Sequence, residues 1–251
     1  MSIISGCRSM GRIIALSLGL VAVSAVSSAT SAQEIYPRNW TGVYLGFGVG
    51  AGAINHQLDV QIPAIPAGVT FDGIGGEGIF GTIQIGADLQ LNRSFVVGLF
   101  LDYDYSGIKT DASFVAPGVV ATGEIPVDDM WTIGARLGYL TSPSTLWYVG
   151  AGYSQMRMGA ATGSISFGGP PLVGSFPLPD FQGYSLLAGV ESQLWNNFSI
   201  KLEYRFTQFE RESVFNIPQV VDIGLEPSIH AARVVASYRF NLGDRYVEPL
   251  K

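Results

Sequence analysis

The sequence predicts an all-β protein, an eight-stranded antiparallel up-and-down transmembrane β-barrel, from three observations. Between Trp40 and Phe240, eight stretches of about a dozen residues alternate apolar side chains with small or polar ones. The gaps between the stretches alternate between about four and about twenty residues, as short turns on one side of a membrane and long loops on the other would. Charged residues make up 14% of the chain, whereas a soluble domain carries about 25%.

The apolar residues are not gathered into a membrane-spanning helix. Mean hydropathy is +0.30, yet after Trp40 no apolar run approaches the roughly 18 residues that such a helix needs. The run that begins at Phe95, for example, meets Asp102. Only helices and closed barrels satisfy every backbone hydrogen bond inside a bilayer, so this composition favours a closed barrel.

The first residues read as a secretory signal peptide, residues 1–32. Arg8 and Arg12 precede an apolar segment, and small residues lead to a cleavage site after Ala32. A helical membrane anchor is the alternative, but the apolar segment is short for one. This leaves a barrel at 33–240 and a short C-terminal tail at 241–251.

Removal of the signal peptide changes the chemistry of the mature chain. Cys7 is the only cysteine, so the mature chain would have no disulfide and no thiol chemistry. Loss of Arg8 and Arg12 would change the formal net charge from -6 to -8. Such an acidic protein is expected to bind no nucleic acid, because nucleic-acid binding depends on clustered Lys and Arg.

Each predicted strand has one apolar face. Glycine fills the opposite face of the first strand, where it leaves room for larger side chains of neighbouring strands. The seventh strand alternates most clearly, with Phe198, Ile200 and Leu202 between Ser199 and Lys201. Pro143 fits a turn between the fourth and fifth strands. In chain order, the predicted strands are 42–53, 78–89, 95–105, 130–140, 147–156, 183–194, 198–206 and 230–240.

Which face meets lipid is a separate question, because a soluble lipocalin-like barrel would bury the apolar face instead. The low charge and the glycine-rich polar face favour the membrane barrel. Aromatic residues also gather toward both ends of the strands, as interfacial girdles do. The predicted girdle at the short turns is Tyr139, Trp147, Trp195, Phe198 and Tyr238. The predicted girdle at the long loops is Tyr103, Trp131, Tyr153, Tyr184 and Phe206.

The inward face carries acids and bases on neighbouring strands. The interior of an eight-stranded barrel is just wide enough for side chains to fill, and buried charges must be paired. We therefore expect a charge network in the lumen, and we favour this structural interpretation over a selectivity ring in a pore. The candidate members are Asp102, Arg136, Glu191, Lys201, Glu203, Arg205 and Arg233.

Three segments carry a family likeness. They are Asn-Trp-Thr-Gly-Val-Tyr-Leu-Gly at 39–46, the strand at 198–206, and Val-Val-Ala-Ser-Tyr-Arg-Phe at 234–240. Together they resemble the small outer-membrane β-barrel proteins common in alphaproteobacteria. That resemblance implies an eight-stranded barrel in the cell outer membrane.

The resemblance also implies partners, namely outer-membrane lipids, lipopolysaccharide and the outer-membrane assembly machinery. Members are variously described as structural surface antigens, porin-like proteins or host-ligand binders, and they share no catalytic site. In this family the aromatic residue of the last strand often ends the chain and helps the assembly machinery recognise it. Here residues 241–251 follow Phe240, which departs from that pattern.

The long loops, expected at 54–77, 106–128, 157–182 and 207–228, combine aliphatic residues with proline. Either the strands extend beyond the membrane and the loops pack on one another, or an apolar cluster binds an extracellular ligand or partner. We favour the first interpretation.

No catalytic, cofactor or metal site is predicted. Glu226, Ser228 and His230 are the residue types of small-barrel lipid A deacylases, but their order and spacing do not match that motif. The glycines follow strand spacing rather than a phosphate loop, and no acidic or histidine cluster has metal-ligand spacing. The expected function is structural support of the envelope with surface loops for contact or ligand binding. The alternative is a narrow porin-like channel for small or hydrophobic solutes, and an outer-membrane enzyme acting on lipid is less favoured.

Overall fold

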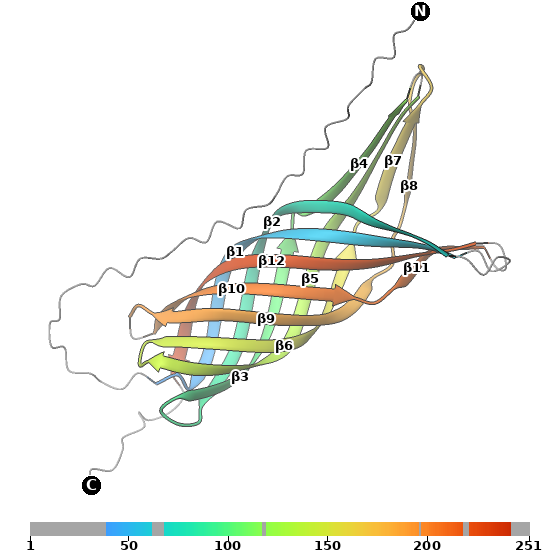
Figure 1. Cartoon of the computed structure of the whole chain (residues 1–251). Helices are drawn as coiled ribbons and strands as arrows, with labels where there is room; N and C mark the ends of the chain where they lie inside the picture. Colours follow the sequence, from blue (N-terminus) through green and yellow to red (C-terminus); the bar gives the residue numbers. More distant parts are fainter. Residues whose placement is uncertain (1–38, 62–67, 117–118, 196, 218–220, 242–251) are drawn as a thin grey trace, which may run out of the picture. The chain divides into compact units, whose positions relative to one another are not determined.

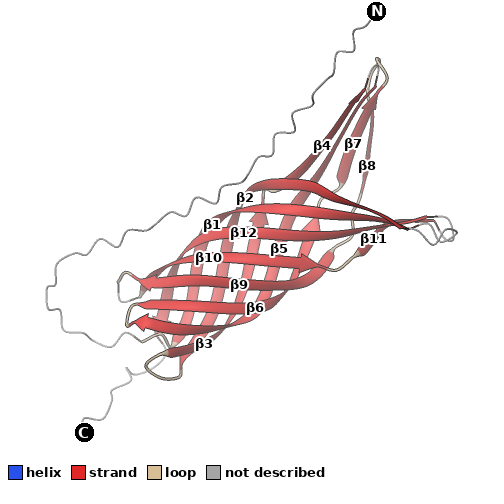
Figure 2. Cartoon of the chain, viewed as in Figure 1, coloured by secondary structure: helices blue, strands red, loops and turns tan. Residues whose placement is uncertain are grey.

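The structure, a computed structural model, describes residues 39–61, 68–116, 119–195, 197–217 and 221–241. The predicted signal peptide and residues 242–251 of the predicted tail lie outside these ranges. All regular secondary structure within them is β-strand (Figure 2). In the described part of the chain, no helix has the length and apolar character needed to cross a membrane.

Eight strands form a closed antiparallel ring (Figure 1). Each pairs with its neighbours in the ring, and pairing of the first strand with the last and of β3 with β5 completes the circle. The predicted fold class is therefore confirmed. In order around the ring, the strands are β1 (Gly42–Gln61), β2 (Gly68–Gln90), β3 (Phe95–Ser106), β5 (Val119–Ser142), β6 (Thr145–Met158), β9 (Phe181–Gln193), β10 (Phe198–Phe209) and β12 (Val221–Asn241).

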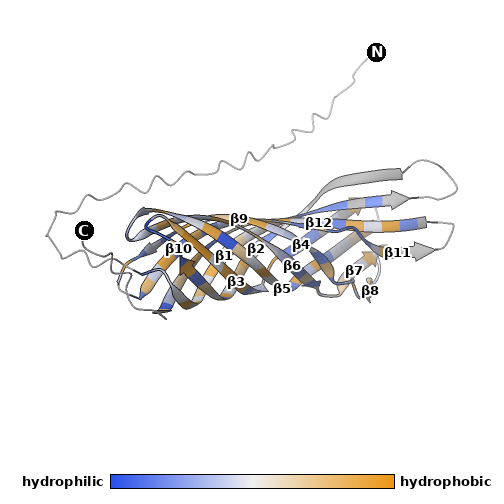
Figure 3. Ribbon diagram, turned by 90° about the horizontal axis from the view of Figure 1, so that it is seen from below, coloured by the Kyte–Doolittle hydropathy of each residue, from blue (hydrophilic) through white to orange (hydrophobic). Residues whose placement is uncertain are grey.

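The apolar face of each ring strand points outward and the polar face points inward. In β10, exposed and buried residues alternate strictly from Phe198 to Arg205, and Figure 3 shows the same alternation of hydropathy along the ribbons. Both predicted aromatic girdles lie on the outer face. Phe198 contacts Tyr238 at 4.9 Å between ring centroids at the short-turn end, and Trp131 contacts Tyr153 at 5.6 Å at the other end. In water, these aliphatic and aromatic side chains would be exposed to solvent. The outer face therefore suits contact with the lipids of a bilayer.

Inward glycines make room for the large side chains of adjacent strands. A Cβ added to Gly189 would lie 2.6 Å from the hydroxyl of Tyr148, and one added to Gly86 would collide with the ring and hydroxyl of Tyr44. By contrast, a Cβ on the outward-facing Gly81 of the same strand as Gly86 would meet nothing within 4 Å. The tight interior therefore depends on the absence of a side chain at the inward positions.

The expectation of four long loops is wrong in extent, because most of their described residues are strands. β1, β2, β5 and β12 are 20 to 24 residues long, about twice the 9–11 residues that cross a bilayer. Four further strands lie wholly in these extensions: β4 (Lys109–Ala116), β7 (Ala161–Ser166), β8 (Leu172–Phe176) and β11 (Glu212–Ile217). Figure 1 shows two extensions, one built on β1, β2, β11 and β12 and the other on β4, β5, β7 and β8. Residues 62–67, in the first predicted loop, lie outside the described ranges.

Proline explains why these extensions were predicted to be loops. Pro126 and Pro227 lie inside β5 and β12, opposite Lys109 and His56, although proline usually interrupts a ladder. Pairing between residues far apart in the sequence forms these strands, and single-strand propensity does not record such pairing.

Residues from all four predicted loops meet in one apolar cluster inside the barrel, at the end that bears the extensions. They pack together with inward residues of the ring strands, so the interpretation that the strands extend and pack on one another is the one that the structure supports. We call this the hairpin-end cluster; its buried members are Ile54, Phe80, Ile108, Val127, Met130, Met156, Met158, Phe181, Phe209, Leu225, Ile229 and Ala231.

The glycine packing predicts a position-specific loss of stability on β2. We expect Gly86→Ala to destabilise the barrel by about 1–3 kcal/mol, the usual cost of overpacking, because the new methyl group overlaps Tyr44. Gly81→Ala is the matched control and should change the unfolding free energy by less than about 0.5 kcal/mol. Urea unfolding in lipid vesicles measures both, and equal stability of the two variants would contradict the account of the glycine positions.

Candidate functional site

Ten charged side chains fill the middle of the barrel, and each is no more than 5% exposed. Five are carboxylates and five are cations, so the formal charges cancel. They come from β2, β3, β5, β9, β10 and β12, at the inward positions of the alternating pattern. The carboxylates are Asp88, Asp102, Asp104, Glu191 and Glu203, and the cations are Arg136, Lys201, Arg205, Arg233 and Arg239.

The half of the network nearer the short turns, the turn-side cluster, joins Asp88, Arg136, Glu191, Lys201 and Arg239. Arg136 donates two hydrogen bonds to Asp88, from Nε at 2.9 Å and from Nη2 at 2.5 Å. Its Nη1 lies 3.0 Å from Glu191. Arg239 reaches the same two carboxylates, at 2.7 Å from Asp88 and 3.2 Å from Glu191. Two arginines on different strands thus hold the same two acids, which fixes β2, β5, β9 and β12 relative to one another.

Lys201 completes the turn-side cluster in a setting suited to a compact cation. Its ammonium donates to Gln84 Oε1 at 2.6 Å and lies 3.7 Å from Glu191. It also lies 3.6 Å from the centroid of the Tyr44 ring. A cation over an aromatic face is attracted by the ring quadrupole, so Tyr44 stabilises a charge that the bilayer would otherwise exclude.

The other half, the hairpin-side cluster, joins Asp102, Asp104, Glu203, Arg205 and Arg233. Arg233 contacts all three acids, at 2.5 Å from Asp102, 2.6 Å from Glu203 and 3.3 Å from Asp104. Arg205 pairs with Asp102 and lies 3.1 Å from Glu203. Arg205 Nη1 also lies 3.9 Å from Asp104, so both arginines reach all three acids, and Arg233 makes the shorter contacts to Asp104 and Glu203.

Neutral side chains add hydrogen bonds to the hairpin-side cluster. Tyr148 donates to Glu203 Oε2 at 2.9 Å, and Arg233 donates to Thr82 at 3.0 Å. Because buried carboxylates must be hydrogen-bonded as well as paired, these neutral donors and acceptors belong to the network.

The two clusters are unequal in formal charge. The turn-side cluster has three cations for two carboxylates, whereas the hairpin-side cluster has two cations for three carboxylates. Tyr148 bridges them, because its ring lies 4.9 Å from the Arg136 guanidinium while its hydroxyl bonds Glu203. This contact links the two clusters across the barrel.

Hydroxyl groups form a buried chain beside the hairpin-side cluster. Thr132 and Ser154 are 2.8 Å apart, Ser154 and Ser185 2.5 Å, and Ser185 and Thr207 2.7 Å. The four residues lie on β5, β6, β9 and β10 in turn. A hydroxyl can donate to one neighbour and accept from the other, so these four hydroxyl groups satisfy one another's hydrogen bonds without any charged residue.

Apolar side chains close the interior at both ends of the network. The hairpin-end cluster closes one end, and Trp40, Val96, Leu140 and Leu146 pack together at the other. A cavity of about 20 Å³ lies between the hairpin-end cluster and Arg205, which is space for about one water molecule. We infer that this part of the interior holds side chains rather than a continuous water column.

The structure brings together all seven residues proposed from sequence for the lumen network. Asp88, Asp104 and Arg239 were not among the predicted members, although the strand alternation already placed each of them on the inward face. Their position in the pattern was therefore the available signal. The neutral partners Tyr44 and Gln84 were not identifiable, because their role depends on contacts between strands that are distant in the sequence.

The candidate hydrolytic residues are not assembled into a site. Glu226, Ser228 and His230 follow one another on one face of β12. His230 Nδ1 bonds the hydroxyl of Tyr204 at 2.7 Å, and Glu226 accepts a bond from Gln208 at 3.0 Å. Among the described residues, no hydrogen bond joins the three to one another, so the base and orienting contacts of a nucleophilic triad are missing.

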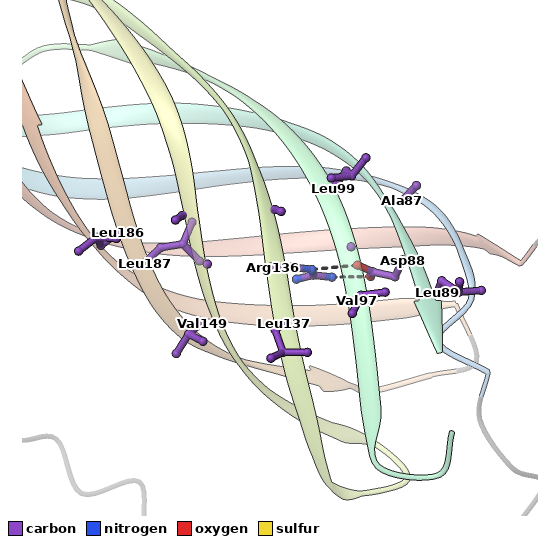
Figure 4. Close-up of a pocket in the computed structure, with 14 residues that line it drawn as sticks. Ala87, Asp88, Leu89, Val97, Leu99, Arg136, Leu137, Val149, Leu186 and Leu187 are labelled. Carbon is purple, nitrogen blue, oxygen red and sulfur yellow. Dashed lines mark hydrogen bonds and ion pairs between the residues drawn. The ribbon is translucent and has the colours of Figure 1, made fainter. Parts of the chain in front are cut away.

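The outer wall has a groove of about 920 Å³ (Figure 4). Leu99, Leu137, Val149 and Leu186 rim it, and all four are between 50% and 66% exposed. The ion pair of Arg136 and Asp88 lies behind the backbone, on the inner side of the same wall. The groove therefore lies on the apolar outer face, and Asp88 and Arg136 of the charge network are among the residues that line it.

His56 lies in the extension of β1, three residues beyond Ala53. Ala53 pairs with His230, near the aromatic girdle that was predicted at the long loops. Its ring is 1% exposed, and Nε2 is 3.0 Å from Thr110 Oγ1. Burial lowers the pKa of His56 to about 4, because the charged imidazolium is poorly solvated there. His56 is consequently neutral at pH 7.

Comparison with known proteins gives a match to the outer membrane protein beta-barrel domain family over residues 18–240. The 31 kDa outer-membrane immunogenic protein of Brucella melitensis is 27% identical over 221 residues, covering 85% of this chain and 89% of that protein. Two solved structures have similar architecture. OprG of Pseudomonas aeruginosa has 10% identity and a TM-score of 0.46, covering 81% of this chain and 99% of OprG. Ail of Yersinia pestis has 12% identity and a TM-score of 0.33, covering 77% and 99%.

The charge imbalance predicts that two buried cations differ in importance. Arg233→Met would leave one cation for three carboxylates in the hairpin-side cluster, and we expect a loss of about 3–5 kcal/mol of unfolding free energy. Lys201→Met would leave two cations for two carboxylates in the turn-side cluster, so we expect a loss of about 1 kcal/mol, mainly from the hydrogen bond to Gln84. Urea unfolding in vesicles compares them, and an equal or larger loss for Lys201→Met would refute the paired-network account.

The burial of His56 predicts a pH effect on the extension. Its folded pKa of about 4 lies below the usual value of about 6.5. The stability due to neutral His56 is thus complete above pH 6.5 and is lost as the pH falls toward 4. Histidine-selective NMR should show a His56 midpoint near pH 4, and titration near pH 6.5 would mean that the ring is solvated.

Proposed function

This chain belongs to the outer membrane protein beta-barrel family and lies in the cell outer membrane, and from that premise we propose that it is a non-conducting structural barrel that presents rigid β-sheet extensions at the cell surface for contact. Its lumen stabilises the wall, and its specificity lies in the extensions.

The filled interior is the single observation that carries the structural part of the proposal. A conducting eight-stranded barrel would need an open polar path, but arginine side chains cross the lumen here to reach acids on other strands. Arg239 on β12, for example, bonds Asp88 on β2 and Glu191 on β9. Moving an ion through this region would require breaking pairs in a low-dielectric interior, where an unpaired charge is strongly unfavourable.

The extensions support the contact part of the proposal. Outer-membrane barrels place short turns in the periplasm and long segments outside the cell, so the two extensions would be extracellular. The ends of the ring, Gly42 and Asn241, pair with each other at the short-turn side, as this orientation requires. The similar Brucella melitensis protein is described as immunogenic, which agrees with exposure at the surface.

We assign no catalytic step to this barrel. The nearest group to a hydrolytic site is the set on β12, in which His230 and Glu226 are bonded to Tyr204 and Gln208 instead of to Ser228. These contacts give the rim residues a structural role at the boundary of the bilayer.

Planar-bilayer recording tests the structural proposal. The purified full-length mature barrel should give no discrete, reproducible open level at neutral pH, because paired side chains fill the lumen. A well-characterised porin in the same bilayers is the positive control. Defined conductance steps of this protein, repeated across preparations, would overturn the non-conducting function and favour the narrow channel instead.

A further inference from the structure

β8 forms an open edge of the extension built on β4, β5, β7 and β8. It pairs with β7, and among the strands of the described residues none lies beyond it. All five residues of β8 are exposed, with Leu172 at 67%, Val173 at 74% and Phe176 at 56%. One side of its backbone therefore offers unpaired N–H and C=O groups, which is the template for addition of another strand.

Proteins usually protect such an edge, but β8 is protected only by its short length and by the prolines that flank it. Lysine, inward-pointing charge, proline or a bulge within the strand would blunt it, but its sequence is Leu-Val-Gly-Ser-Phe. Pro171 and Pro177 lie just outside it and limit the length of the edge rather than blocking it. At the other edge of the sheet, β4 contains Lys109 and Asp111.

The charge distribution restricts where a second copy of this chain can meet the first. A mature chain of net charge -8, as the predicted cleavage leaves it, would repel another copy over most of its surface. The β8 edge is uncharged, so two copies meet there without placing like charges opposite each other.

The sequence of β8 is also complementary to itself. If two copies run antiparallel with Gly174 opposite Gly174, then Leu172 lies opposite Phe176 of the second copy at both ends. Val173 lies opposite Ser175 in the same register. Pairs of aromatic and aliphatic residues stabilise adjacent strands, and glycine at the centre lets the two backbones approach.

We propose that β8 pairs antiparallel with β8 of a second copy, centred on Gly174, and joins the two extensions into one continuous sheet. This proposal rests on the surface-contact part of the proposed function and names the partner. A pair of five-residue strands is marginal alone, but confinement of both barrels to a membrane raises their effective concentration. The contact is therefore reversible and depends on protein density in the membrane.

Cysteine cross-linking on whole cells tests the pairing. The mature chain would contain no other cysteine, and a side chain at Gly174 meets nothing within 4 Å in one copy. Gly174→Cys should give a disulfide-linked dimer under mild oxidation, because the two cysteines face each other at the centre of the pair. Ser113→Cys, on the exposed face of β4 in the same sheet, is the matched control and should remain monomeric.

A second variant and a labelling experiment separate the possible failures. Adding Val173→Lys to Gly174→Cys should reduce the dimer about fivefold, because a charge on the edge opposes strand addition. If a membrane-impermeant maleimide labels Gly174→Cys but no dimer forms, or both cysteine variants cross-link equally, the pairing is refuted while the surface location stands. If the maleimide does not label Gly174→Cys on whole cells, the surface-contact function fails together with the pairing.

Discussion

The narrow interior of an eight-stranded ring is the constraint from which the rest of this structure follows. Side chains on the inner face must fill a fixed volume, and any charge among them must find an opposite charge there. The ten buried charged residues meet both conditions, since Arg205 and Arg233 each contact three acids. Gly86 and Gly189 leave room in the same volume for Tyr44 and Tyr148. Packing and charge pairing in the lumen therefore depend on the same residues.

The same constraint separates the roles of the wall and the extensions. A filled lumen leaves little room for transport or binding inside the barrel, so recognition is left to the segments beyond the membrane. These segments are strands with a shared apolar cluster under them, and pairing holds them in fixed register from β1 through β12. A rigid sheet offers a defined edge such as β8, whereas flexible loops would lose conformational entropy on binding.

Strict alternation made the ring readable from sequence. Inward positions recur at every second residue, so the eight strands and the seven proposed network residues could be placed without a structure. The family resemblance came from three short segments of the sequence. The pattern failed at the extensions, where residues such as Pro126 and Pro227 suggested loops. Pairing with distant strands decided the conformation there, and a single sequence does not record it. The partners of each network residue could not be predicted for the same reason. Lys201, for example, contacts Gln84 and Tyr44, which lie on strands distant in the sequence.

The arginines of the lumen are paired with acids and shielded from water. The most direct measurement is hydrogen–deuterium exchange of arginine side-chain Nε protons by NMR, with the barrel in lipid. Arg136 and Arg233 are at most 5% exposed and use Nε to bond Asp88 and Glu203, whereas the side chain of Arg157 is 59% exposed. We expect the Nε protons of Arg136 and Arg233 to persist long after that of Arg157 has exchanged. Exchange of all three at the same rate would show that water fills the lumen.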